Sequence, residues 1–214
     1  MNSHYYPVLL DLRGRLCIVI GGGTIATGKV EGLLEAGAWV TVIAPALSPT
    51  LAALVEAGRV CYLARAYQPG DLVGAFLAVG ATDDRSANAA AWQEASDRHL
   101  LFNAVDDVPH CNFIAPSILR QGDLTVAIST SGKAPALAVR LKERLAPELG
   151  QEYARFLELA GDLRAGLAAQ VPDFEERKAL WYRLVDSDVI ALLRAGDEAA
   201  ARQRIEAITG VRLG

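Results

Sequence analysis

The chain has 214 residues, of which 52% are hydrophobic and 21% charged, and its formal net charge at pH 7 is −4. This composition excludes a disordered chain, and the acidic balance argues against a nucleic-acid partner, which usually meets a basic stripe on the protein. No apolar run approaches the roughly 20 residues that a membrane-spanning helix needs. We therefore expect a well-cored globular protein that binds neither nucleic acid nor a membrane.

Apolar runs alternate with helix-like segments in the first half of the chain, which is typical of a parallel sheet covered by helices. The second expected strand is stopped by Pro45, and Ser86 is the candidate N-cap of the third expected helix. We predict a Rossmann-like domain over residues 1–112. In chain order, its expected strands cover 16–20, 39–44, 60–64, 75–82 and 100–105, and its expected helices cover 24–36, 49–57 and 86–98.

The pattern changes after residue 112. One more strand is expected over 124–130, followed by a helix that begins near Pro135 and runs towards Gly150. From residue 151 onward only helix-like runs remain, with apolar residues at helical spacing. We predict a small α+β dimerisation or linker region over 113–150 and a helical C-terminal domain over 151–214.

Cysteine usage indicates where the protein works. The chain has three cysteines, Cys17, Cys61 and Cys111, which are far apart and form no C-x-x-C pair. An odd number at such spacing is typical of a reducing compartment, and the three histidines add no metal-ligand spacing. No basic segment precedes an apolar one at the N-terminus, so we expect no signal peptide. These features predict a cytoplasmic protein without a structural metal site.

The stretch GGGTIATGKV, residues 21–30, can be interpreted in two ways. The spacing G-x-G-x-x-A from Gly21 is a dinucleotide turn, whereas the spacing G-x-x-x-x-G-K from Gly23 to Lys29 is most of a nucleoside-triphosphate P-loop. The P-loop needs a serine or threonine after its lysine to coordinate magnesium, and the residue here is Val30, which has no oxygen. The strand before the turn and the helix after it therefore favour a dinucleotide.

The usual ribose-binding carboxylate is absent after the second strand. That strand runs into Ala44 and Pro45, and the next acid is Glu56. The ribose must then be held by backbone or hydroxyl groups, with Ser48 as one candidate. After the second strand, no lysine or arginine comes before Arg59 that could neutralise a 2′-phosphate, which favours NAD over NADP.

Polar residues follow several strands at the edge where open α/β sheets bind ligands. The stretch ATDD (81–84) is either a strand end with a helix cap or part of a site. Asp106 directly follows the fifth strand, where a carboxylate can move a proton while a nicotinamide takes hydride, although Asp-Asp is also ordinary turn chemistry. The loop STSGKAP (129–135) either holds an anion or caps a helix, and Arg140 and Arg144 either meet substrate carboxylates or form a solvated face.

Several of these stretches together resemble the siroheme-synthase family over residues 7–150. They are VIGGGTIATGKVEGLLEAGAWVTVIAP, ATDD and NAVDDVPHCNFIAPSILRQGDLTVAISTSGKAPALAVRLKERL, in that order. The resemblance implies an NAD-binding Rossmann domain, a dimerisation region and a helical domain that work as a homodimer with a tetrapyrrole cleft. It implies oxidation of precorrin-2 to sirohydrochlorin with NAD as hydride acceptor and, in bifunctional members, insertion of a metal such as Fe²⁺ or Co²⁺. It also implies the stand-alone form, without the methyltransferase domain of some members.

The resemblance assigns roles to individual residues. It implies that Asp106 is catalytic. The cofactor contacts that it implies, together with neighbouring strand-end residues, are Gly21, Gly22, Gly23, Thr24, Ile25, Ala44, Pro45, Ala46, Thr82 and Asn103. The implied substrate contacts are Ser129, Thr130, Ser131, Gly132 and His110. Lys133 and Ala134 depart from the small or hydroxyl residues that the family usually has there, which leaves substrate contacts at these two positions open.

Two alternatives to the dehydrogenase remain at this point. One is a non-catalytic module that binds NAD or a tetrapyrrole and regulates another process. The other is a chelatase without dehydrogenase activity, in which Asp106 with His110 strips the pyrrole protons.

Overall fold

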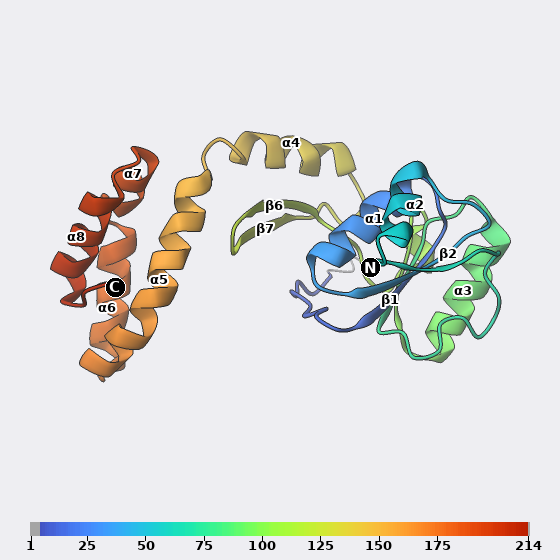
Figure 1. Cartoon of the computed structure of the whole chain (residues 1–214), viewed down its shortest axis with the longest axis horizontal. Coiled ribbons are helices and arrows are strands. Elements are labelled where there is room, and N and C mark those ends of the chain that lie inside the picture. The colour runs from blue at the N-terminus through green and yellow to red at the C-terminus, as the bar shows by residue number, and fades with distance from the viewer. Residues whose placement is uncertain (1–4, 214) are drawn as a thin grey trace. The chain divides into compact units, whose positions relative to one another are not determined.

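The computed structural model describes residues 5–213, which form two compact units that meet between Ala115 and Pro116 in the chain (Figure 1). Each unit has its own hydrophobic core: two clusters lie in the first unit and one in the second. None of the helices in the described part is long and apolar enough to cross a membrane.

The first unit is built on a five-stranded sheet in the order β3-β2-β1-β4-β5, in which every neighbouring pair is parallel. The chain runs outward from β1 to β3 and then returns to place β4 on the other side of β1, so the strand order reverses between β1 and β4. Such a switch point opens a crevice at the carboxyl ends of the strands. The strands are β1 (Leu16–Ile20), β2 (Trp39–Ile43), β3 (Cys61–Leu63), β4 (Leu77–Gly80) and β5 (Leu101–Ala104).

Helices cover both faces of this sheet, which explains why β4 is buried along its whole length. One core cluster joins alternate strand residues to α1 (Thr24–Glu35) and α2 (Pro49–Glu56). The other cluster joins the opposite strand faces to α3 (Arg85–Asp97). A short 3₁₀ turn, η1 (Val108–His110), follows β5.

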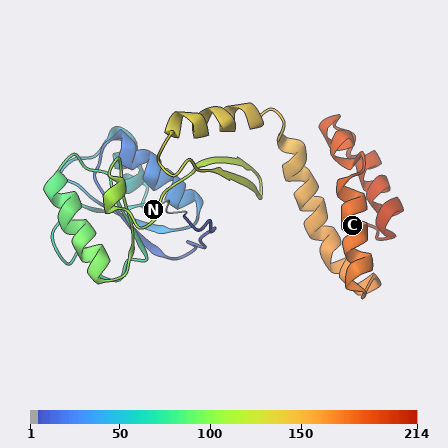
Figure 2. The same ribbon diagram turned by 180° about the vertical axis from the view of Figure 1, so that it is seen from behind.

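The second unit begins with an antiparallel hairpin of β6 (Ser117–Gln121) and β7 (Leu124–Ile128), against which α4 (Pro135–Leu145) packs. Four helices follow, with α7 packed on α5 and α8, and α6 packed on α8 (Figures 1 and 2). They are α5 (Gln151–Gln170), α6 (Phe174–Val185), α7 (Val189–Arg194) and α8 (Glu198–Thr209). Leucines at helical spacing on α5 form the centre of this core: Leu159, Leu163 and Leu167.

The predicted fold class is confirmed: a Rossmann-like parallel sheet comes first and a helical region follows it. Strand β6 was missed because its sequence SILRQ is only half-buried and has no apolar run. The predicted N-cap of the third helix is wrong, because α3 begins at Arg85 and Asp84 caps it by accepting from the backbone N–H groups of Ser86 and Ala87 at 2.9 and 3.1 Å. The three-way domain division stays a prediction.

The core of the helical unit supports a stability prediction. Leu163 is fully buried, so Leu163→Ala is expected to lower the free energy of unfolding by about 2–5 kcal/mol, through lost apolar burial and the cavity left behind. The same truncation at Leu137, which is 52% exposed on α4, is expected to change it by less than about 0.5 kcal/mol. Urea unfolding followed by circular dichroism measures both, and equal effects would contradict the assigned core.

Candidate active site

The turn after β1 packs closely against the carboxyl ends of β2 and β4. Gly21 has a φ of +126°, and a Cβ there would lie 2.1 Å from the carbonyl oxygen of Ala81. A Cβ on Gly22 would lie 1.9 Å from the carbonyl oxygen of Ala46. Both positions therefore require glycine because backbone from the β4 and β2 ends approaches them so closely.

Gly23 has a different environment. It is exposed, and a Cβ there would meet no atom within 4 Å. It is the N-cap of α1 but provides no side-chain cap, and the next residues, Thr24 and Ile25, are exposed as well. The first backbone N–H groups of α1 thus face open space with the positive end of the helix dipole, which suits an anion. A dinucleotide pyrophosphate fits this turn.

The end of β2 offers no acid to a ribose, as the sequence predicted. Ala44 is buried, whereas Pro45 and Ala46 are exposed beside the glycine turn. The hydroxyl of Ser48, the other candidate, is already engaged: it lies 2.8 Å from the Thr27 hydroxyl and accepts from the N–H of Leu51 at 3.3 Å. The exposed residues Pro45 and Ala46 are therefore what this loop presents to a ribose.

Asn88 of α3 stabilises the loop after β4. Its amide donates to the carbonyl oxygen of Thr82 at 3.0 Å, and a Cβ on Gly80 would lie 2.5 Å from the Asn88 Oδ1, so a larger residue at 80 would displace this side chain. The Thr82 hydroxyl accepts from the N–H of Asp84, and Asp84 caps α3. The capping interpretation of ATDD therefore holds for Asp84, while Thr82 stays at the sheet edge beside the glycine turn.

Asn103 organises the loop after β5. It is buried, and its amide donates to the carbonyl oxygen of Phe113 at 3.1 Å and to the Cys111 sulfur at 3.4 Å. The Cys111 thiol in turn donates to the carbonyl oxygen of Ala104 at 3.2 Å. These bonds use the NH₂ group of Asn103 within the protein and fix the loop that carries Asp106.

Asp106 lies at the carboxyl end of β5 in an unusual backbone conformation. Its φ is +59°, a left-handed conformation that costs a non-glycine residue roughly 1–2 kcal/mol. Its side chain is exposed and makes no hydrogen bond or ion pair with any residue in 5–213. The Asp106 carboxylate is therefore available to a bound ligand.

His110 lies on the same loop. Its Nδ1 is 2.6 Å from Oδ2 of Asp107, and its ring centroid is 6.0 Å from that of Trp92. Within the residues that the structure describes, no group of three or more histidine, cysteine, aspartate or glutamate side chains is arranged to hold a metal ion.

The loop 129–132 belongs to the second unit, where it leads into α4. The Ser129 hydroxyl accepts from the N–H of Ser131 at 3.1 Å, and the Thr130 hydroxyl accepts from the N–H of Ala134 at 3.2 Å. Ser131 and Gly132 both have positive φ values, of 53° and 77°. Two of the three hydroxyls therefore shape the loop itself, and the Ser131 hydroxyl is the one with no hydrogen bond to the described chain.

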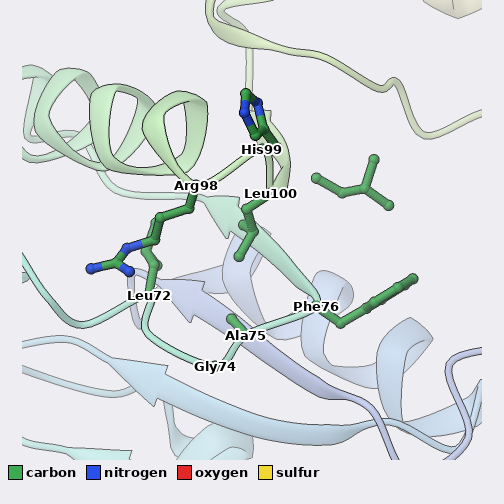
Figure 3. A pocket seen from close by; sticks show the side chains of 8 residues that line it. Leu72, Gly74, Ala75, Phe76, Arg98, His99 and Leu100 are labelled. Atoms are coloured by element: carbon green, nitrogen blue, oxygen red, sulfur yellow. The ribbon is translucent and has the colours of Figure 1, made fainter.

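A cavity of about 390 Å³ lies at the opposite edge of the sheet (Figure 3). Its lining residues lie before β4 and up to the first residue of β5, whereas Asp106 follows β5, so the cavity does not coincide with the candidate site. The Arg98 guanidinium in its wall is paired with Glu94 at 2.8 Å. The lining is formed by Leu72, Gly74, Ala75, Phe76, Arg98, His99, Leu100 and Leu101.

The cysteines differ in environment, which predicts an order of reaction. Cys61 is exposed, whereas burial raises the pKa of the Cys17 thiol to about 11 and also raises that of Cys111. A thiol reagent at pH 8 is expected to modify Cys61 first and Cys17 only after unfolding. Mass spectrometry of partly labelled protein checks this order, with Cys61→Ser as the control. Labelling of Cys111 as fast as Cys61 would show a reactive thiol in the candidate site.

Three family models match the chain in order. The model described as putative NAD(P)-binding matches residues 8–117, just over half of the chain. The model described as sirohaem biosynthesis protein central matches 121–146, and the sirohaem synthase dimerisation region matches 152–208. The dimerisation model therefore lies over the helical region, whereas the dimerisation or linker region was expected at 113–150.

Curated relatives and a solved structure agree with these models. A siroheme synthase of Photobacterium profundum is 40% identical over 205 residues, covering 96% of this chain and 44% of that protein. Siroheme synthase 1 of Pectobacterium atrosepticum is 41% identical over 203 residues, covering 95% of this chain and 42% of that protein. The structure of SirC, a precorrin-2 dehydrogenase, superimposes with a TM-score of 0.78 at 28% identity, covering 95% of this chain and 100% of that chain.

The chain thus spans less than half the length of the curated relatives it matches. The NAD(P)-binding model lies over the unit that holds the glycine turn, and the two sirohaem models follow it in the second unit. The chain belongs to the siroheme-synthase family, with an NAD(P)-binding domain as its first unit.

Proposed function

We propose that the chain oxidises precorrin-2 to sirohydrochlorin with NAD. The observation that carries this proposal is the free carboxylate of Asp106, held in a strained conformation at the same edge of the sheet as the glycine turn. The likeness to SirC, a precorrin-2 dehydrogenase, supports it.

Each part of the site has a task in this reaction. NAD, when bound, supplies the hydride acceptor. Gly23 and the first turn of α1 hold its pyrophosphate, and the exposed residues at the β2 end receive its ribose. Asp106 accepts the proton that leaves the substrate with the hydride, so that the substrate loses two electrons and two hydrogen nuclei in all.

The same proposal covers the remaining cofactor contacts, Ile25, Ala44, Thr82 and Asn103, of which Asn103 acts through the loop that it holds. His110 in the first unit and, considered separately, the loop 129–132 in the second unit are our candidate substrate contacts. The free hydroxyl of Ser131 supports a role of this loop in binding a tetrapyrrole carboxylate.

The proposed assembly is a homodimer in the cytoplasm. The match to a sirohaem synthase dimerisation region over 152–208 supports the dimer. The three free thiols support a reducing compartment.

Metal insertion into sirohydrochlorin is a second proposed activity, because the relatives are siroheme synthases and siroheme contains iron. Fe²⁺ or Co²⁺ would enter as a substrate, and two pyrrole protons would leave. Asp106 is the exposed carboxylate that can take them in turn.

The test supplies purified protein with precorrin-2 and NAD, with and without Fe²⁺ or Co²⁺, and follows the absorption spectrum. We expect sirohydrochlorin and NADH without metal, and a further spectral change with metal. No change with NAD would contradict the dehydrogenase. Metal insertion into supplied sirohydrochlorin without NADH formation would show a chelatase alone, and binding without any turnover would show a regulatory module.

A further inference from the structure

Asp107 and His110 form a pair at the two ends of the η1 turn. The Asp107 Oδ2 lies 2.6 Å from the Nδ1 of His110, and each side chain is 40% exposed. Asp107 is the N-cap residue of η1, yet its side chain accepts no hydrogen bond from the N–H groups of that turn. The carboxylate of Asp107 is therefore used on the imidazole and not on the backbone.

This contact selects one tautomer of His110. An ionised carboxylate has no hydrogen to donate, so the Nδ1 of His110 must carry the shared proton. In the neutral imidazole, the lone pair is then on Nε2. The Trp92 ring packs against the His110 imidazole, with 6.0 Å between the ring centroids. It also packs against Phe102 of the core, with 6.1 Å between centroids, so His110 contacts a ring that is itself fixed in place.

The proposed oxidation gives this lone pair a proton to accept. Once Asp106 has accepted the proton from the substrate, its O–H must be ionised again before the next turnover. His110 is four residues further along the same loop, and its Nε2 is the nitrogen that the contact with Asp107 leaves free.

We propose that Asp107 is a positioning residue that holds His110 with its Nε2 lone pair free, and that His110 removes the proton from Asp106 after each oxidation. This rests on the proposed function. The hydride goes to NAD and gives NADH, while the accompanying proton breaks its bond to the substrate and forms an O–H bond on Asp106. That proton then passes to Nε2 of His110, directly or through one water, and the imidazolium beside Asp107 releases it to solvent.

The positioning is tested without any turnover. Protein labelled with ¹⁵N-histidine gives an NMR pattern that reports the tautomer, and His110→Gln identifies which signals belong to His110. We expect a protonated Nδ1 and an unprotonated Nε2 in the wild-type chain. In Asp107→Ala, the pattern is expected to change to one dominated by a protonated Nε2. A protonated Nε2 in the wild-type protein would overturn the positioning role, whatever the activity.

Kinetics test the proton transfer. Asp107→Ala and His110→Gln are each expected to lower kcat by about tenfold, because water replaces the relay only in part, and to leave the KM for NAD within about twofold. If Asp107 acts only through His110, Asp107→Ala causes no further loss in the His110→Gln background. The control is Asp97→Ala, which removes an exposed carboxylate at the far end of α3 and is expected to leave kcat unchanged.

Three results decide between the claims. An unchanged kcat in Asp107→Ala overturns the relay. An equal further loss in the His110→Gln background shows that Asp107 has a structural role and overturns the positioning of His110. Wild-type protein that has the expected tautomer but does not oxidise precorrin-2 contradicts the proposed function and the relay, while the positioning stands.

Discussion

Asp106→Asn is expected to lower kcat for precorrin-2 oxidation by about 10²–10⁴-fold and to leave the Kd for NAD unchanged. Asparagine has nearly the same size and tolerates the left-handed backbone at this position, where φ is +59°. The substitution therefore removes the proton acceptor while keeping the loop. Because the Asp106 carboxylate has no partner within residues 5–213, its loss leaves no buried group unpaired.

The measurement combines steady-state kinetics with NAD titration by calorimetry. Asp97→Asn is the matched control, because this aspartate is exposed in the same unit and lies at the C-terminal end of α3. It should behave as wild type in both measurements. A kcat for Asp106→Asn within about threefold of the wild-type value would exclude Asp106 as the proton acceptor.

Gly23→Ala is expected to weaken NAD binding at least about tenfold while the chain stays folded. A methyl group at this position would meet no protein atom within 4 Å, and the backbone there has a φ of −84°, which alanine adopts readily. The added methyl group would instead occupy the space through which the pyrophosphate approaches the first turn of α1. A tenfold loss corresponds to about 1.4 kcal/mol of binding free energy.

Two other glycines in the same stretch serve as controls. Gly28 lies within α1 with no atom close to its added Cβ, so Gly28→Ala should stabilise the fold by up to about 1 kcal/mol and bind NAD normally. Gly22→Ala should destabilise the fold. Its Cβ would lie 1.9 Å from the Ala46 carbonyl oxygen, so the free energy of unfolding is expected to fall by about 1–3 kcal/mol or more. Normal NAD affinity in Gly23→Ala would contradict pyrophosphate binding at this turn.

The central strands β1, β4 and β5 could be predicted because they are largely buried and so appear as continuous apolar runs. The same rule failed for β6, whose residues 117–121 lie in a half-buried hairpin with charged and polar members. From the spacing alone, the tight turn could be assigned to Gly21 and the close approach of the pyrophosphate to Gly23. Only the structure showed that Gly22 is constrained as tightly as Gly21, because the β2 end that contacts it lies more than twenty residues away in the chain.

The candidate site was predictable where position along a strand was enough. Asp106 could be named because it follows the fifth strand, but its positive φ and its free carboxylate depend on how the loop closes on Asn103. The pairing of Asp107 with His110 requires a 3₁₀ turn, which the local sequence does not indicate. The sequence makes Ser48 a candidate for the ribose, but its contact with Thr27 depends on the fold, which brings the N-cap of α2 to α1.

If the glycine turn and Asp106 belong to one site, NAD reduction and precorrin-2 oxidation must occur in a fixed ratio, which a stoichiometry measurement determines. Purified protein is given a limiting amount of precorrin-2 and an excess of NAD in the absence of metal, and NADH and sirohydrochlorin are quantified together. We expect one NADH for each sirohydrochlorin formed, with the rate of both products falling in parallel in Asp106→Asn. Sirohydrochlorin formed at the same rate without NAD, or no sirohydrochlorin with NAD, would contradict a single NAD-dependent site.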